Sequence, residues 1–127
     1  MGPTWEYAAM HGDVDTARRL LQAGEDINAR DGHGQTALML AAHHGHRALV
    51  ELLIENGADL NLTAKYRLSA LMLAVVAGHT DIVRRLVRAG ADRAIQGSGA
   101  PGFAGKTAYD LAVEREMKDL WEDLHPR

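Results

Sequence analysis

A stretch in the last third of the chain carries the residue types of a phosphate-binding loop. It reads Ala100-Pro-Gly-Phe-Ala-Gly-Lys-Thr107. Such a loop surrounds phosphates with backbone amides, a lysine and a hydroxyl, and it lies between a buried strand and a helix. Here the first position is alanine instead of glycine, and the preceding segment 93–97 is too short and polar for a buried strand. Nucleotide binding through residues 100–107 is therefore a remote alternative.

Histidines form a second group of residues that could do chemistry. His43, His44 and His46 lie close together in the chain, and His11 precedes His44 by the same interval at which His79 follows His46. A zinc site needs three or four converging ligands, whereas neighbouring side chains on a helix diverge by about 100°. We therefore expect no metal site. Contact with a partner suits His11, His43 and His44 better, with a pH dependence near the unperturbed pKa of about 6.5.

Nucleophilic catalysis has little support in this chain. There is no cysteine, and the serines are Ser69, at an expected helix start, and Ser98, in a glycine-rich stretch. A serine nucleophile needs a histidine and a carboxylate within reach, and neither position offers them. Acidic pairs such as Glu122-Asp123 are typical of solvated faces. We expect a protein that is not an enzyme and has no cofactor.

Composition narrows the class of protein further. The net charge is −3 and the hydrophobic content is 46%. A dedicated nucleic-acid binder is usually basic, so we expect no nucleic-acid partner. No apolar stretch reaches the length that spans a membrane, and the start of the chain lacks the basic and apolar regions of a signal peptide. The default expectation is a cytoplasmic monomer without a membrane partner.

Two series of glycines recur at one fixed interval. The first consists of the equally spaced Gly12, Gly45 and Gly78, and the second consists of Gly24, Gly57 and Gly90, with the same spacing. A period of this length, about 33 residues, is typical of ankyrin solenoids. The period therefore sets the register in which every other residue is interpreted.

The residues between the glycines resemble the ankyrin-repeat family. One copy opens with Asp-Gly-His-Gly-Gln-Thr-Ala-Leu-Met-Leu-Ala-Ala at 31–42 and closes with Leu-Val-Glu-Leu-Leu-Ile-Glu-Asn-Gly-Ala-Asp at 49–59. The same sequence pattern recurs in segments 69–79 and 82–92. A first copy lacks the opening loop, and a fourth copy starts at 105–112. The resemblance implies one all-α domain over 1–127, a solenoid of helix-turn-helix units with β-hairpin-type loops and terminal repeats that act as caps. The expected repeats are 1–30, 31–63, 64–96 and 97–127.

Local residue choices agree with this reading. Thr36, Ser69 and Thr107 precede apolar runs and can cap the first turn of a helix. Glycine at 45 and 78 can end that helix in the left-handed conformation. The two tryptophans lie in the terminal copies, where we expect them to seal the core.

Three departures from the family's pattern stand out. Met39 and Met72 replace the usual histidine and are expected to pack as apolar fillers. Arg67 lies where glycine usually turns the loop. An insertion makes the step from Ser69 to Thr107 longer than one repeat, and its glycine-rich segment 96–105 contains Phe103. Phe103 either makes a partner contact at the loop tip or folds back onto the cap repeat.

The resemblance implies binding through the concave face and the loop tips. The partner is another protein or a peptide, and the chain acts as an adaptor, an inhibitor or an immunity-like factor; the alternative is a regulatory subunit of a partner enzyme. Tyr66 leads the expected contacts, because exposed aromatic residues are frequent hot spots. The predicted contact residues are His33, Gln35, His43, His44, Lys65, Tyr66, Leu68, Val76, Phe103, Glu114 and Arg115.

Overall fold

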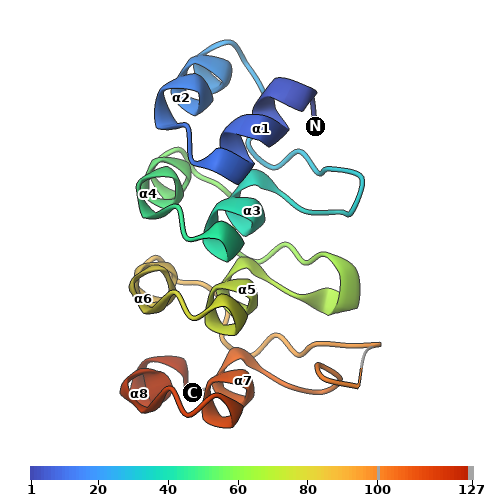
Figure 1. Cartoon of the computed structure of the whole chain (residues 1–127), viewed down its shortest axis with the longest axis vertical. Coiled ribbons are helices and arrows are strands. Elements are labelled where there is room, and N and C mark those ends of the chain that lie inside the picture. Colours follow the sequence, from blue (N-terminus) through green and yellow to red (C-terminus); the bar gives the residue numbers. More distant parts are fainter. Residues whose placement is uncertain (100, 126–127) are drawn as a thin grey trace.

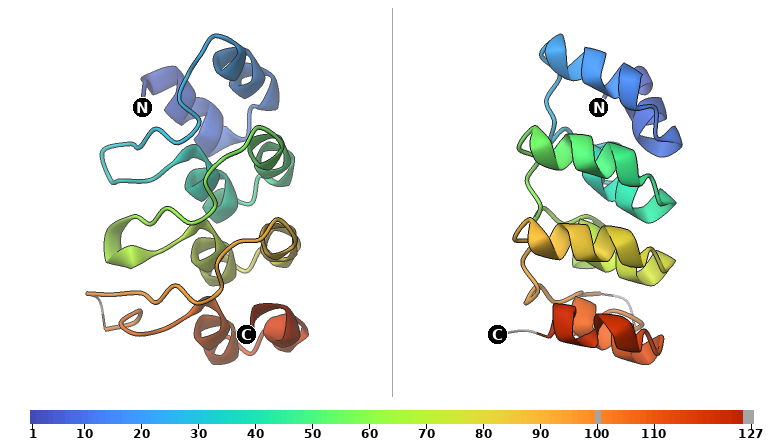
Figure 2. Two further views of the ribbon diagram at one scale, coloured as in Figure 1. Left: turned by 180° about the vertical axis from the view of Figure 1, so that it is seen from behind. Right: turned by 90° about the vertical axis from the view of Figure 1, so that its left-hand side faces the viewer.

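The fold is a stack of four helix pairs along one axis (Figure 1). We describe it from a computed structural model, which describes residues 1–99 and 101–125. In chain order the elements are α1 (Pro3–His11), α2 (Val14–Gln22), α3 (Ala37–His44), α4 (Arg47–Glu55), the 3₁₀ turn η1 (Lys65–Arg67), α5 (Ala70–Ala77), α6 (Thr80–Arg88), α7 (Ala108–Glu114), the 3₁₀ turn η2 (Lys118–Leu120) and α8 (Trp121–Leu124). The inner helices, which are α1, α3, α5 and α7, stand in one row, and the outer helices, which are α2, α4, α6 and α8, stand in a second row beside it (Figure 2). The expected all-α repeat solenoid is confirmed, and we number its helix pairs as the first to fourth units.

The loops between units project from the same side of the stack, to the right in Figure 1. They are closed by hairpin-like backbone bonds, from Asp31 N–H to the carbonyl of Gln35 (2.8 Å) and from Ala64 N–H to the carbonyl of Leu68 (3.0 Å). The described residues contain no β-strand, and the only extended pairing among them is an isolated bridge between Gly97 and Ala104. The loops are therefore hairpin-type in their hydrogen bonds but too short to form a sheet.

Inner helices begin where the sequence places a hydroxyl. The side chains of Thr36 and Ser69 each accept a hydrogen bond from the amide three residues on, at 3.3 Å. Thr107 forms a complete capping box with Asp110. These bonds satisfy amides that the first turn leaves without a helical partner. The predicted caps are confirmed.

Small side chains let the inner helices pack closely. Ala8, Ala41, Ala74 and Ala112 occupy equivalent positions and are fully buried. The methionines that replace the family's histidine, at 39 and 72, are each 1% exposed, which confirms their role as apolar fillers. Each helix pair therefore buries its apolar face against the next pair, as in other solenoids.

The terminal units differ in how they close the core. Trp5 is 1% exposed and lies at the register position of Leu38, so the first tryptophan seals the core as expected. Trp121 is half-buried and packs against the same core. The fourth unit is built from shorter helices, with seven residues in α7 and four in α8. Over residues 1–99 and 101–125, no helix has the length and apolar character needed to cross a lipid bilayer.

Candidate partner-binding face

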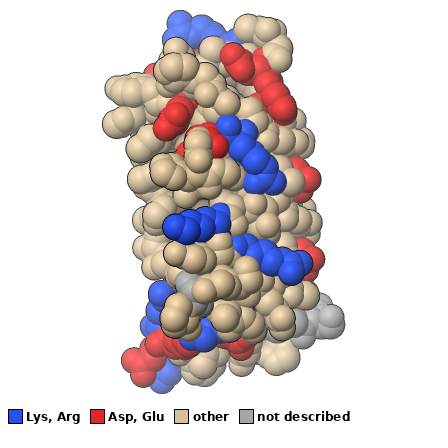
Figure 3. All heavy atoms as spheres, turned by 90° about the vertical axis from the view of Figure 1, so that its right-hand side faces the viewer, with Lys and Arg blue, Asp and Glu red and all other residues tan. Residues whose placement is uncertain are grey.

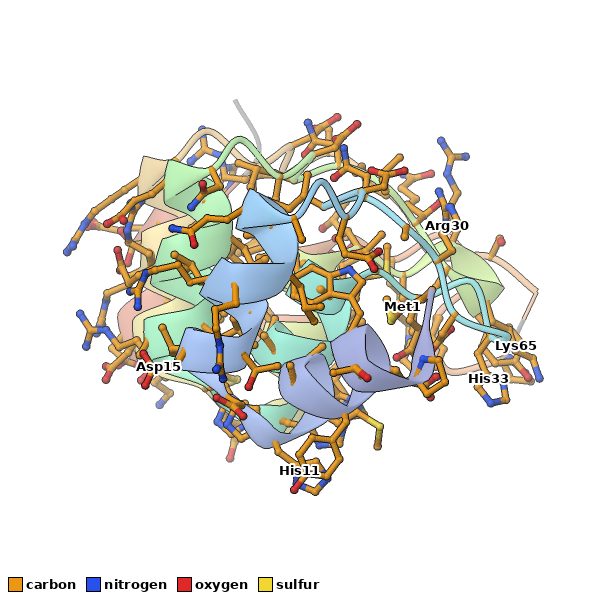
Figure 4. All side chains as sticks on the ribbon, turned by 90° about the horizontal axis from the view of Figure 1, so that it is seen from above. Met1, His11, Asp15, Arg30, His33 and Lys65 are labelled. Carbon is orange, nitrogen blue, oxygen red and sulfur yellow. The ribbon has the colours of Figure 1, made fainter. Side chains whose placement is uncertain are left out.

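Most of the predicted contact residues are exposed on the loop tips and on the carboxyl-terminal ends of the inner helices. Figure 4 looks down the stack and shows His33 and Lys65 projecting on the loop side, while His11 lies at the end of α1. The exposed members of the predicted set are His33, His43, His44, Lys65, Tyr66, Glu114 and Arg115, and the half-buried members are Gln35, Val76 and Phe103.

Leu68 is the exception, and its predicted exposure is wrong. Its side chain is 8% exposed and belongs to the apolar core. Its carbonyl accepts the Ala64 amide that closes the loop, as the carbonyl of Gln35 accepts the Asp31 amide one repeat earlier. Gln35 is half-buried at the equivalent position, so an apolar side chain there packs into the core instead of facing a partner.

Two of the histidines are structural ties between units. The ring Nε2 of His46 donates to the carbonyl of Met10 at 2.6 Å, and that of His79 donates to the carbonyl of His43 at 3.1 Å. A carbonyl only accepts, so the proton in each bond lies on Nε2. Each ring also packs on the glycine that ends the preceding inner helix. These two residues hold neighbouring units together and are not free for a partner.

The other histidines of the group stay exposed at the helix ends. The ring centroids of His43 and His44 are 5.3 Å apart, and the Tyr7 ring lies 4.2 Å from that of His11. Partial burial is the main cause that lowers the pKa of His44, and the neighbouring histidines at 43, 46, 11 and 79 lower it further. In the part of the chain that the structure describes, no three His, Cys, Asp or Glu side chains are grouped to hold a metal ion. This arrangement suits contact with a partner, in which the neutral ring of His44 is favoured.

The loop of the third unit has an unusual backbone. Tyr66 and Arg67 both have positive φ, at 62° and 58°. The residue one repeat before Arg67 is Gly34, whose φ is 77°. An L side chain costs roughly 1–2 kcal/mol for each residue in this region. Arg67 therefore keeps the conformation of the glycine that it replaces, at a cost in stability.

The insertion packs against this same loop. The Ser98 amide donates to the carbonyl of Tyr66 at 2.8 Å, and the Phe103 ring centroid lies 6.1 Å from that of Tyr66. A side chain at Gly97 would meet the carbonyl oxygen of Phe103 at 2.5 Å, so the closed insertion requires glycine there. Phe103 thus folds back on the neighbouring loop of the third unit and does not stand out at an extended tip.

The residues that resembled a phosphate-binding loop have other partners. The Lys106 ammonium forms an ion pair with Glu114, and the Thr107 hydroxyl belongs to the capping box of α7. Ala100, the first residue of that stretch, lies outside the described residues. The lysine and the hydroxyl are therefore engaged within the fourth unit, at the end and at the start of α7 respectively.

Sequence reasoning missed two exposed residues. Tyr7 is 59% exposed, although the equivalent positions in the next two units, Leu40 and Leu73, are buried. The missing opening loop of the first copy was the available signal. Arg67 is exposed beside Tyr66. The sequence signal for its exposure was that arginine occupies a loop position where the family usually has glycine.

Comparisons with known proteins agree with the register. A family model described as ankyrin repeats, in three copies, matches residues 5–97, which is most of the chain. No curated protein matches the sequence.

Proposed function

The chain belongs to the ankyrin-repeat family, and from that premise we propose that it acts by stoichiometric binding, as an adaptor, an inhibitor or an immunity-like factor. Ankyrin repeats are generally protein–protein interaction modules. We assign the contact to the face that combines the loop tips with the exposed ends of the inner helices.

One observation carries this proposal. Aromatic, basic and histidine side chains are exposed together on this face. The buried positions beneath them are filled by Ala, Leu and Met, which belong to the core. Tyrosine and arginine dominate binding energy at many interfaces. Tyr7, Tyr66 and Arg67 give the face such anchors at two separate places, which suits a folded partner or an extended peptide.

The residue types that could serve catalysis support the same reading. Ser69 is a buried helix cap, Thr107 is held in a capping box, and Lys106 is paired with a carboxylate. Their side chains serve the fold. We therefore assign to this chain a binding role, with any chemistry belonging to its partner.

The test is a native pull-down read by mass spectrometry. The wild type is compared with a Tyr66→Ala, His44→Ala double variant and with an Arg19→Ala, Arg88→Ala double variant, whose exposed arginines lie on outer helices. We expect the first variant to lose a protein that the wild type and the second variant retain. Equal capture by all three would place the docking surface elsewhere.

A second measurement separates an adaptor from a subunit of an enzyme. The captured protein is purified alone, its activity is assayed, and this chain is then titrated into it. A fall in rate to near zero that saturates at one equivalent indicates an inhibitor, and a partial change or a rise that saturates in the same way indicates a regulatory subunit. Saturable binding with an unchanged rate indicates an adaptor.

A further inference from the structure

The tip of the third unit holds a conformation that its residue types disfavour. Tyr66 and Arg67 both lie in the left-handed region, where the second unit has Gly34 at the second of these positions. A strained backbone persists only where the surrounding structure holds it in place, and such residues are concentrated at functional sites such as ligand contacts. Glycine at position 67 would relieve the strain, so the arginine side chain is present although it lowers the stability of the loop.

The insertion supports the strained tip from one side. Its Ser98 amide binds the Tyr66 carbonyl at 2.8 Å and its Phe103 ring lies against Tyr66. Gly99 also approaches the tyrosine, since a Cβ built there would lie 3.4 Å from the ring. A side chain that is ordered before binding loses little further freedom in the complex. The insertion thus prepares Tyr66 for contact and leaves 37% of the residue exposed.

Basic groups at this tip form no ion pair with the residues that the structure describes. Lys65 and Arg67 are exposed, and neither forms an ion pair with any described residue; the Lys65 ammonium lies 5.0 Å from the centre of the Tyr66 ring. Arg30 in the preceding loop is exposed as well, and its guanidinium donates to the carbonyls of Gly34 and Thr63. Figure 3 faces the loop tips and shows basic side chains across the middle and at both ends, with acidic ones toward the two ends, along one edge and beside the uppermost basic group of the middle.

Within the hairpin 31–35 of the second unit, the acidic residue Asp31 does not cancel this charge at the surface. The carboxylate of Asp31 accepts hydrogen bonds from the amides of His33 and Gln35, at 2.8 and 2.9 Å. It is therefore turned into its own loop, while the His33 ring points outward beside the third loop (Figure 4). We call His33, Lys65, Tyr66 and Arg67 the tip patch.

We infer that the tip patch binds an acidic segment of the partner protein, with carboxylates on Lys65 and Arg67 and an apolar side chain against Tyr66. This inference rests on the proposed function and specifies its partner. Arginine binds carboxylates through paired hydrogen bonds, and tyrosine and arginine are common binding hot spots. A nucleic acid fits less well, because the chain carries a net charge of −3 and its free basic groups do not form a long track.

The test is a selection of random dodecapeptides displayed on phage. The baits are the wild type, a Lys65→Gln, Arg67→Gln variant, and an Arg19→Gln, Arg88→Gln control that removes the same charge from the outer helices. We expect the wild type and the control to enrich peptides rich in Asp and Glu, and the tip variant to lose them. For a synthetic copy of the most enriched peptide, we expect the tip variant to raise the Kd about tenfold or more, since bonds to charged groups are the stronger ones.

A further variant separates binding from folding. Arg67→Gly keeps the loop's conformation and removes the charge, so it should weaken the peptide while the Tm rises by about 2 °C, because relief of strain outweighs the extra freedom of glycine in the unfolded chain. An unchanged Kd would show that the arginine does not contact the peptide.

Several outcomes would overturn the inference. They are enrichment of neutral or basic peptides, no enrichment at all, equal enrichment by the tip variant, or tighter binding of a duplex DNA oligonucleotide than of any selected peptide. Peptides that depend on His44 and not on the tip patch would leave the proposed function standing while this inference fails. Failure of the wild type to capture any protein in the pull-down would instead defeat the proposed function itself.

Discussion

His44 is the side chain whose protonation its surroundings oppose most clearly. Partial burial and four neighbouring histidines, at 43, 46, 11 and 79, lower its pKa in the folded chain. In the unfolded chain a histidine has a pKa near 6.5. As the pH falls below that value, His44 therefore binds a proton more readily in the unfolded chain than in the folded chain. The free energy of unfolding therefore has a contribution that is present above about pH 6.5 and is lost below it.

The expected result is a pH-dependent difference between the wild type and His44→Gln. When the pH is lowered from about 7.5 to about 5.5, the wild type should lose more stability than the variant. Only the wild type has a histidine at position 44, whose protonation the folded chain opposes. Urea unfolding followed by circular dichroism at several pH values measures the difference. Parallel stability curves for the two proteins would contradict the lowered pKa.

The sequence predicts residues whose role depends on near neighbours in the chain, and it fails where tertiary packing decides. Thr36 caps a helix through the amide of Met39, three residues on, and such local geometry follows from residue type. The exposure of Tyr7 and the burial of Leu68 depend on which neighbouring segments pack against each side chain. The register alone does not contain that information.

At the scale of elements, contact between units depends on glycine at the end of an inner helix where a histidine ring of the next unit packs on it, as at Gly12 and Gly45. Gly45 and Gly78 share a φ of 79°, but their surroundings differ. A Cβ on Gly45 would lie 2.7 Å from the His79 ring, whereas a Cβ on Gly78 would meet nothing within 4 Å. The fourth unit has Met117 at the register position of His79, so no histidine ring covers Gly78.

This difference predicts unequal costs for the same substitution. Gly78→Ala should cost about 1 kcal/mol from the left-handed backbone alone. Gly45→Ala should cost about 1 kcal/mol or more in addition, because the His79 ring must move and give up its bond to the His43 carbonyl. Denaturant unfolding of both variants measures this. Combining each substitution with His79→Ala should remove most of the difference, and equal costs in the two single variants would contradict the tie.

The insertion shows how far an element can be predicted without its contacts. The length of the step from Ser69 to Thr107 located the extra residues, and their composition predicted a loop. Its path back to Tyr66 depends on a bond from Ser98 and on the close approach at Gly97, neither of which has a sequence pattern. The position of the segment was therefore predictable, and its role as a support for the neighbouring tip was not.

At the scale of the whole molecule, stability is expected to vary along the stack. Each unit of a solenoid contacts only its neighbours, so a terminal unit is held from one side. The fourth unit also has the shortest helices, and a helix as short as α8 is not stable alone. Its attachment to the third unit includes Arg84, whose guanidinium pairs with Asp119 at 3.2 Å and Asp123 at 3.5 Å.

Arg84→Ala should therefore loosen the end of the stack without affecting its middle. We expect faster amide hydrogen exchange over residues 111–124 and unchanged exchange over residues 39–55, since opening of one terminal unit leaves the others packed. The ion pairs are partly exposed, with 35% of the Arg84 side chain accessible, so the loss in global stability should stay below about 1 kcal/mol.

The matched control is Arg47→Ala, which breaks the exposed pair with Asp81 between two units that are each held on both sides. That control should leave local exchange nearly unchanged, because the helices on both sides still hold its unit. Equal acceleration across all four units in Arg84→Ala would mean that the stack opens as a single cooperative body, and the fourth unit would then share the stability of the core in spite of its short helices.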